Sequence, residues 1–297
     1  MKKILLILAV ALFAMQQPIE GKKLPKKEMA IQLYSIRELI GDPQKFAQNH
    51  VAVFKQLKEM GYTAVEAANY DNGKFYGLTP EAYKAECEAA GLKPISSHST
   101  RGLSDEEIKN HDFTAALQWW DQCIAAHKAA GCTYLITPWG PVPKNLKEAQ
   151  VWCDYHNEIG KRCNAAGLKY GYHTHSHEFQ KVEDKIWIEY MLDHVDAANM
   201  FWQMDVYWCV MAQQAPIQWF KKYPGRFALL HIKDKFEVGQ SGMVGYDPIF
   251  SNASLAGMKN YVVELEGTDG TIDIMEGVRR SAEYLRSSQF VKASYTK

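Results

Sequence analysis

The sequence lacks an excess of charge of either sign. Among 297 residues, 34 lysines and arginines balance 34 aspartates and glutamates, so the net charge at pH 7 is zero. Without an overall basic field the composition argues against a protein held on nucleic acid, because that function needs positive charge against phosphates. With 47% hydrophobic residues, the chain has enough apolar material for a large core.

The N-terminal apolar run is too short to span a bilayer comfortably. Ile4 to Met15 follow two lysines, Ala14 is a small residue at a plausible cleavage site, and no cysteine lies nearby for a lipid anchor. This pattern is typical of a secretory signal. We therefore expect residues 1–20 to be a signal peptide and leader and residues 21–297 to be the catalytic domain. Export, most simply to a bacterial periplasm, would leave no membrane anchor on the mature protein.

The sequence also lacks a CxxC pair. Its six cysteines mostly lie inside helical or strand-like stretches, in contrast to the dense framework of a small disulfide-stapled domain. We expect buried free thiols, with one incidental disulfide as the alternative. The six are Cys87, Cys123, Cys132, Cys153, Cys163 and Cys209.

One structural unit recurs along the chain. The segments "KEMGYTAVEA", "EAAGLKPISSH", "KAAGCTYLITPW" and "NAAGLKYGYHTH" each combine a helix end, a glycine and a β-rich run. A helix often ends at a left-handed residue, which glycine adopts without steric cost. We therefore expect Gly61, Gly91, Gly131 and Gly167 to end helices.

Eight β-rich runs follow one another at intervals of 28 to 41 residues. Helical patterns separate them, which predicts an α/β fold, a single (β/α)₈ TIM barrel. A doubly wound open sheet is the alternative, but the even spacing and the lack of a glycine-rich phosphate fingerprint disfavour it. The runs end near Tyr34, Glu66, His98, Trp139, His173, Asp205, Lys233 and Glu266.

Ionisable residues gather at the predicted carboxyl ends of at least six of these strands. The active sites of such barrels lie at that end, and an unpaired charge on a buried strand costs several kcal/mol. Imidazole and carboxylate groups suit a divalent ion such as Mn²⁺, Zn²⁺, Co²⁺ or Mg²⁺. Residues two apart on a strand share a face, so these strands can each direct two such side chains inward. One of the two can bind the ion, and the other is then free to act as an acid or base or to hold a ligand in place. The pairs are His173 with His175, His231 with Lys233, and Glu264 with Glu266.

The segments "GYHTHSHEF", "MDVYW", "PGRFALLHIKD" and "VVELE" resemble the xylose isomerase-like barrels known as sugar phosphate isomerases/epimerases. The resemblance implies a metal-dependent carbohydrate enzyme with one divalent ion, held in that family by Glu, Asp, His and Glu from strands five to eight. The matching ligands here are His173, Asp205, His231 and Glu264. His173 stands at the strand-five position, where the family more commonly has glutamate. This difference argues against a mechanism in which two symmetric ligand carboxylates each move a proton, as in the ketose 3-epimerases. Glu178 or His175 is an alternative there, and Glu266 is the alternative to Glu264.

Other residues at this end are candidates for catalysis and substrate binding. As acid or base we consider Glu266, Lys233, His175 and Glu66, although Lys233 serves as a base only if burial lowers its pKa. An ion pair with Lys233 is the structural alternative for Glu66. The candidate substrate contacts are His98, Trp139, Trp208 and Tyr34, with packing as the alternative for the aromatic side chains.

The sequence thus predicts a metal-dependent isomerase or epimerase that acts through an enediolate on a free sugar or keto-sugar. Two alternatives are a lyase or dehydratase that eliminates from a 3-keto-glycoside or keto-sugar, and a non-catalytic sugar-binding barrel. Apurinic endonucleases share the barrel, but Trp208 stands where they place a metal ligand. A small carbohydrate is therefore the expected partner. Barrels of this family often pair, so a homo-oligomer is consistent with the resemblance.

Overall fold

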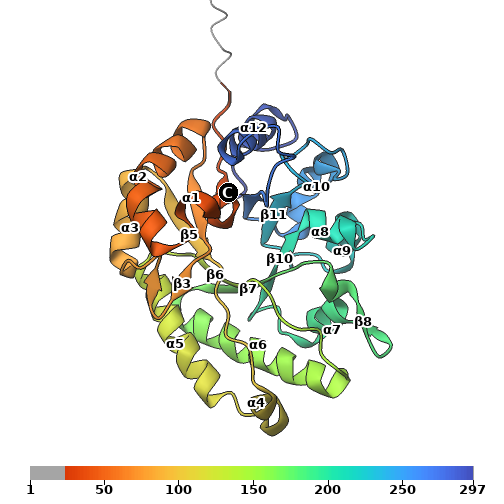
Figure 1. Ribbon diagram of the computed structural model, residues 1–297. Helices are drawn as coiled ribbons and strands as arrows, with labels where there is room; N and C mark the ends of the chain where they lie inside the picture. Colours follow the sequence, from red (N-terminus) through yellow and green to blue (C-terminus); the bar gives the residue numbers. More distant parts are fainter. Residues whose placement is uncertain (1–23, 297) are drawn as a thin grey trace, which may run out of the picture.

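The computed structural model describes residues 24–296. The predicted signal peptide and leader, residues 1–20, lie outside the described residues. Eight parallel strands form one sheet that curls into a barrel inside a ring of helices (Figure 1), which confirms the (β/α)₈ prediction. The barrel strands are β1 (Ala30–Gln32), β2 (Ala64–Ala67), β5 (Lys93–Ser97), β6 (Tyr134–Thr137), β7 (Lys169–His173), β10 (Phe201–Asp205), β11 (Leu229–Lys233) and β12 (Asn260–Glu264).

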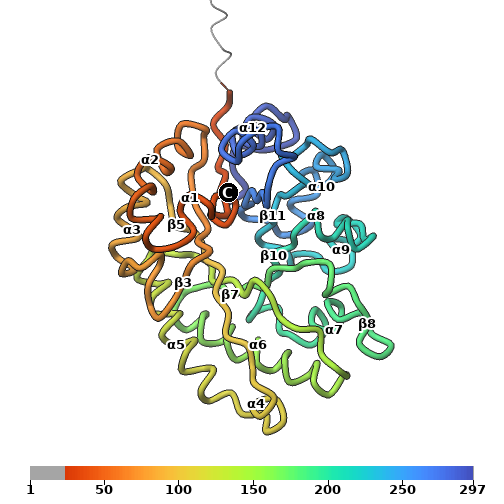
Figure 2. The backbone as a smooth tube through the Cα atoms, viewed as in Figure 1, coloured from red at the N-terminus to blue at the C-terminus, as the bar shows by residue number. Residues whose placement is uncertain are grey.

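The strands are arranged so that the first and last units of the chain lie side by side. The order in the sheet is β5-β2-β1-β12-β11-β10-β7-β6, and Ala30 of β1 pairs with Val262 of β12. Figure 2 shows the red N-terminal part of the described chain beside the blue C-terminal helix (Ile274–Ser287). Just after β5, an isolated parallel bridge joins His98 to Ile136 of β6, and Ser99 N donates to the carbonyl of Ile136 at 2.9 Å. The barrel is therefore nearly closed, and all eight carboxyl ends meet at one rim.

The longer helices end where the repeated glycines predict. Gly61 and Gly167 cap α2 and α6 with φ of +104° and +84°, and Gly91 and Gly131 are also left-handed. None of the described helices is long and apolar enough to cross a membrane. The helices are η1 (Leu33–Ile36), α1 (Arg37–Ile40), α2 (Pro43–Met60), α3 (Pro80–Ala89), α4 (Asp105–Asn110), α5 (Thr114–Ala129), α6 (Leu146–Ala166), η2 (His177–Phe179), α7 (Trp187–His194), α8 (Val206–Met211), α9 (Pro216–Lys222), α10 (Tyr246–Ser251), α11 (Ala253–Ala256) and α12 (Ile274–Ser287). The short strands β3 (Tyr70–Asp71) and β4 (Lys74–Phe75) form one hairpin, and β8 (Lys181–Val182) and β9 (Lys185–Ile186) form another.

The interior of the barrel changes from apolar to polar along the strands. A small apolar cluster contains Leu229 and Val262, and two residues further on the buried side chains are His231 and Glu264. Alternate residues of a strand share a face. The inward-facing side chains of β11 and β12 are therefore apolar in the core of the barrel and ionisable at the carboxyl end of the strands. All six cysteines are buried and free, which confirms the expectation of buried thiols.

Candidate metal centre and substrate pocket

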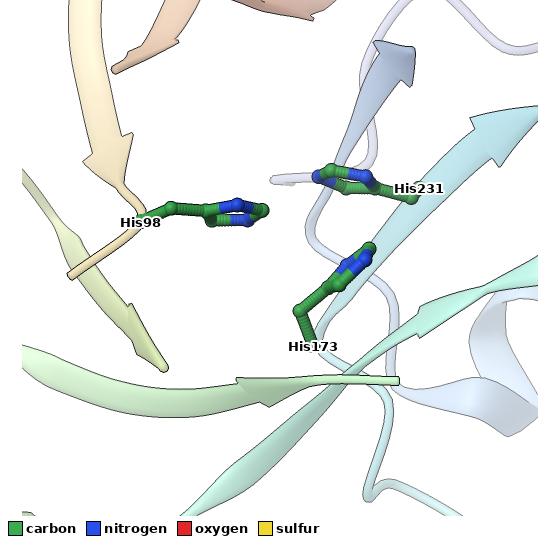
Figure 3. A group of neighbouring side chains, drawn as sticks. All are labelled: His98, His173 and His231. Carbon is green, nitrogen blue, oxygen red and sulfur yellow. The ribbon is translucent and has the colours of Figure 1, made fainter. Parts of the chain in front are cut away.

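Four buried side chains from consecutive strands meet at one centre. His173 ends β7, Asp205 ends β10, His231 lies in β11 and Glu264 ends β12. Each offers one ligand atom, and these atoms all lie within 4.8 Å of one another. The structure therefore brings together the four residues that the sequence proposes as ligands. In Figure 3 the rings of His173 and His231 point into the barrel interior, with His98 beside them.

Two of these side chains carry buried polar atoms without a partner among the described residues. Asp205 Oδ1 accepts a hydrogen bond from the backbone N–H of Trp208 at 2.9 Å, but Oδ2 has no donor, and Nδ1 of His173 also has no partner. Such burial is unfavourable, and it raises the pKa of Asp205 to about 7. Imidazole nitrogen and carboxylate oxygen are common ligands of divalent ions. The residues therefore fit the predicted ion.

His231 is held between two carboxylates. Its Nε2 lies 2.7 Å from Glu66 Oε1, and its Nδ1 lies 3.2 Å from Glu264 Oε2. Burial lowers the pKa of His231, but the two carboxylates outweigh burial and raise it to about 10. The carboxylates of Glu66 and Glu264 therefore favour a positively charged group at this position. Because Glu66 accepts a hydrogen bond from Nε2, it fixes the ring and leaves Nδ1 to act as a ligand.

Glu66 lies below the metal centre, fully buried and surrounded by donors. Burial raises the pKa of this carboxyl, but His98 and His231 outweigh burial and hold it well below its usual range. The groups that contact its oxygens are Gln32 Nε2 at 2.8 Å, Ser96 Oγ at 2.6 Å, Gln203 Nε2 at 2.8 Å, His231 Nε2 at 2.7 Å and His98 Nε2 at 3.0 Å.

This environment changes the interpretation of Glu66. The carboxylate lies outside the cavity that His173 and Glu264 line, and hydrogen-bonding groups contact both of its oxygens, so the predicted acid–base role stays a prediction that these surroundings disfavour. The alternative of an ion pair with Lys233 is wrong, because Glu66 pairs with His231 and His98. The contact of Glu66 with His231 Nε2 at 2.7 Å instead suits a carboxylate that holds the His231 ring in place.

Lys233 is a buried ammonium among carboxylates. Its Nζ lies 2.6 Å from Glu266 Oε1 and 3.6 Å from Glu264 Oε2, and it lies 5.6 Å from the centre of the Trp208 ring. Burial lowers the pKa of Lys233, but the neighbouring carboxylates outweigh burial and raise it. The condition set for a base is therefore not met, and Lys233 is a fixed positive charge beside the pocket.

His175, His177 and Glu178 form a separate group after β7. Glu178 is fully buried and accepts hydrogen bonds from Tyr172 Oη at 3.0 Å and from the backbone N–H of His175 at 2.8 Å. His177 Nε2 lies 3.1 Å from the same carboxylate. Although these three residues are near enough to share an ion, they do not join the four-residue centre. The side chain that the fifth barrel strand, β7, places at that centre is therefore His173, rather than Glu178 or His175.

A cavity of about 560 Å³ adjoins the four-residue centre. It has the size of a ligand pocket, and it reaches His173 and Glu264 at its base. Most of the predicted substrate contacts and two of the predicted acid–base residues line it, whereas Trp208 does not and instead packs behind Lys233 and His175. The lining residues are Tyr34, Ala68, Asn69, Tyr70, His98, Ser99, Thr100, Pro138, Trp139, His173, His175, Glu264 and Glu266.

Sequence reasoning missed two sets of residues. Gln32 and Gln203 are buried donors to Glu66, and their alternation with inward-facing neighbours could have revealed them. Asn69, Ser99 and Thr100 line the pocket from loops after β2 and β5. Loop residues follow no periodic pattern, so no comparable signal identifies them.

Comparisons with known proteins support the fold. The model of the xylose isomerase-like TIM barrel family matches residues 54–288, whereas no curated protein gives a significant match. A sugar phosphate isomerase/epimerase from Parabacteroides distasonis is 34% identical over 92% of this chain and 98% of its own, with a TM-score of 0.81. The fold alone is similar in the IOLI protein with a bound zinc atom (14% identity, TM-score 0.66, 91% of this chain and 100% of that chain). The fold is also similar in an L-ribulose 3-epimerase, which is 12% identical with a TM-score of 0.67 over 87% of this chain and 93% of that chain. The chain belongs to the xylose isomerase-like TIM barrel family.

Proposed function

We propose that this protein is a divalent-metal-dependent isomerase or epimerase of a free sugar or keto-sugar that works through an enediolate. The convergence of His173, Asp205, His231 and Glu264 below a sugar-sized pocket carries the proposal. A P. distasonis protein described as a sugar phosphate isomerase/epimerase, at 34% identity, adds support.

The side chains around the pocket can supply the proton transfers. When bound, a divalent ion polarises a substrate carbonyl and its neighbouring hydroxyl group. Glu266 and His175 line the pocket just after the ends of β12 and β7, two strands that are separated by two others. One of them removes the proton next to the carbonyl and the other returns it. Lys233 does not line the pocket, and its ion pair with Glu266 at 2.6 Å holds that carboxylate at the pocket wall.

The pocket walls favour an uncharged sugar. Tyr34 and Trp139 are 45% and 54% exposed at the rim. The Arg37 guanidinium covers one face of the Tyr34 ring at 4.2 Å, and the remaining exposed aromatic surface suits the apolar side of a sugar ring. Among the described residues that line the pocket, none is a lysine or an arginine, whereas phosphate recognition commonly uses such groups. A free sugar or keto-sugar also suits the export that residues 1–20 predict, which we retain as part of the proposal.

A lyase is the second candidate. Glu266 and His175 are chemically different groups, which suits removal of a proton on one side and protonation of a leaving oxygen on the other. In a 3-keto-glycoside the base takes the proton next to the carbonyl, and the C–H electron pair forms an enolate C=C bond to the carbonyl carbon while the carbonyl oxygen becomes negatively charged. When the carbonyl re-forms, that electron pair forms the C=C bond to the glycosidic carbon as the glycosidic C–O bond breaks, and the departing oxygen takes that bond's electron pair and a proton from the acid.

Incubation of the metal-loaded protein with ketoses and keto-glycosides in deuterated water tests both candidates. We expect deuterium to enter the substrate at the carbon next to the carbonyl, because both reactions begin with loss of that proton. Mass spectrometry detects the label and chromatography detects a released aglycone. Label without cleavage supports isomerisation or epimerisation, whereas cleavage supports the lyase. No label and no product with any substrate would contradict the enzymatic proposal and leave a sugar-binding barrel.

A further inference from the structure

A second, smaller cavity adjoins the substrate pocket. Its volume is about 140 Å³, and it shares Thr100 and Trp139 with the larger pocket. Its walls are largely aromatic, with Trp120, Trp152 and Tyr155 contributed by α5 and α6. A molecule bound over the metal centre therefore has an apolar recess within reach, on the side of the pocket that Trp139 borders.

The polar atoms of this recess are nearly all satisfied within the protein. Trp120 Nε1 donates to Tyr155 Oη at 2.7 Å, and Tyr155 Oη donates to the carbonyl of Arg101 at 2.7 Å. His156 bonds to Tyr170 Oη at 2.8 Å, and burial lowers its pKa to about 3, so the ring is neutral. Trp152 Nε1 is buried without a partner among the described residues. Such walls suit an apolar ring with at most one acceptor, rather than the many hydroxyl groups of a sugar.

The size of the recess matches one aromatic ring, since a dry apolar cavity of about 150 Å³ binds benzene. We propose that this recess binds the aromatic aglycone of the substrate, which makes the substrate class an aryl keto-glycoside. This inference rests on the lyase candidate of the proposed function, because a free sugar carries no aglycone, and it specifies the substrate of that candidate. The sugar occupies the larger pocket above the metal centre, and the aryl group passes Trp139 into the recess.

The test compares a phenyl keto-glycoside with the matching methyl keto-glycoside. We expect the KM of the wild-type protein to be about tenfold or more lower for the phenyl substrate, because an apolar ring leaves water. Gly102 lines the recess but not the sugar pocket, and a Cβ there would meet no atom within 4 Å. Gly102→Leu should therefore raise the KM for the phenyl substrate about tenfold and change kcat/KM for the methyl substrate less than about twofold. Gly102→Ala is the control of smaller volume.

Binding provides a second measurement that does not depend on activity. Titration of the wild-type protein with phenol should change tryptophan fluorescence, and Gly102→Leu should remove that change. Equal KM values for the two substrates, or equal effects of Gly102→Leu on both, would overturn the aglycone site even when the methyl substrate takes up deuterium. Failure of either substrate to exchange would instead count against the proposed function, and the absence of a phenol response would then count separately against the recess.

Discussion

Asp205→Asn will remove the bound metal and lower turnover by more than about 100-fold, while the barrel stays folded. Asparagine keeps the shape of the side chain and an oxygen that can accept the hydrogen bond from Trp208 N at the start of α8. It loses the negative charge and the unpartnered Oδ2 that face the centre. Loss of a supporting partner alone costs about 10–100-fold in metal affinity or activity, so loss of a ligand should cost more. Metal analysis of purified protein and the deuterium-uptake assay measure the two effects.

Asp273→Asn is the matched control for that change. Asp273 also caps a helix, α12, by accepting a hydrogen bond from the backbone N–H of Glu276 at 2.9 Å, but it lies outside the site. We expect full metal content and activity in this control, and circular dichroism should show both variants folded. Wild-type activity in Asp205→Asn would contradict the assignment of the centre.

Glu66→Gln should weaken metal binding by about 10–100-fold without removing any proposed ligand. The substitution keeps the shape of the side chain but replaces a carboxylate oxygen with a donor in a place where four hydrogen-bond donors and the His98 ring converge. His231 then loses the group that fixes its ring and presents Nδ1 to the centre. Isothermal titration of metal-free protein with Mn²⁺ or Zn²⁺ measures the affinity, and turnover at saturating metal should recover in part.

Glu178→Gln is the matched control for Glu66→Gln. Both carboxylates are fully buried, but Glu178 contacts Tyr172, His175 and His177 rather than His231. Its substitution should leave metal affinity at the four-residue centre within about threefold of the wild type, less than the loss expected when a supporting partner is removed. If both variants weakened binding equally, general destabilisation rather than the orientation of His231 would explain the result.

The barrel was predictable because its signals are local. Each glycine after an amphipathic helix fixes a boundary, as Gly61 and Gly167 show, and the even spacing of the strands leaves few topologies. The convergence of Asp205 with His231 follows from the same logic, because parallel strands end at one rim. Alternation along β11 and β12 then turns His231 and Glu264 inward.

The roles of individual groups were less predictable because they depend on contacts between distant strands. Nothing local distinguishes Glu66, held by Gln203 from 137 positions away, from a carboxylate that faces substrate. The direction of the pKa shift of Lys233 likewise depends on whether burial or the carboxylates of Glu264 and Glu266 dominate. Trp208 is near Asp205 in sequence, yet its position in α8 carries it behind the pocket. The roles of Glu66, Lys233 and Trp208 therefore become apparent only when the contacts of the folded chain are known.

Anomalous diffraction from crystals of the protein loaded with Mn²⁺ or Zn²⁺ tests the central claim most directly. We expect one strong peak with His173, Asp205, His231 and Glu264 around it, where their ligand atoms already lie within 4.8 Å of one another. Asp205 and His231 without a shared ion, or an ion held instead by His175, His177 and Glu178, would contradict it.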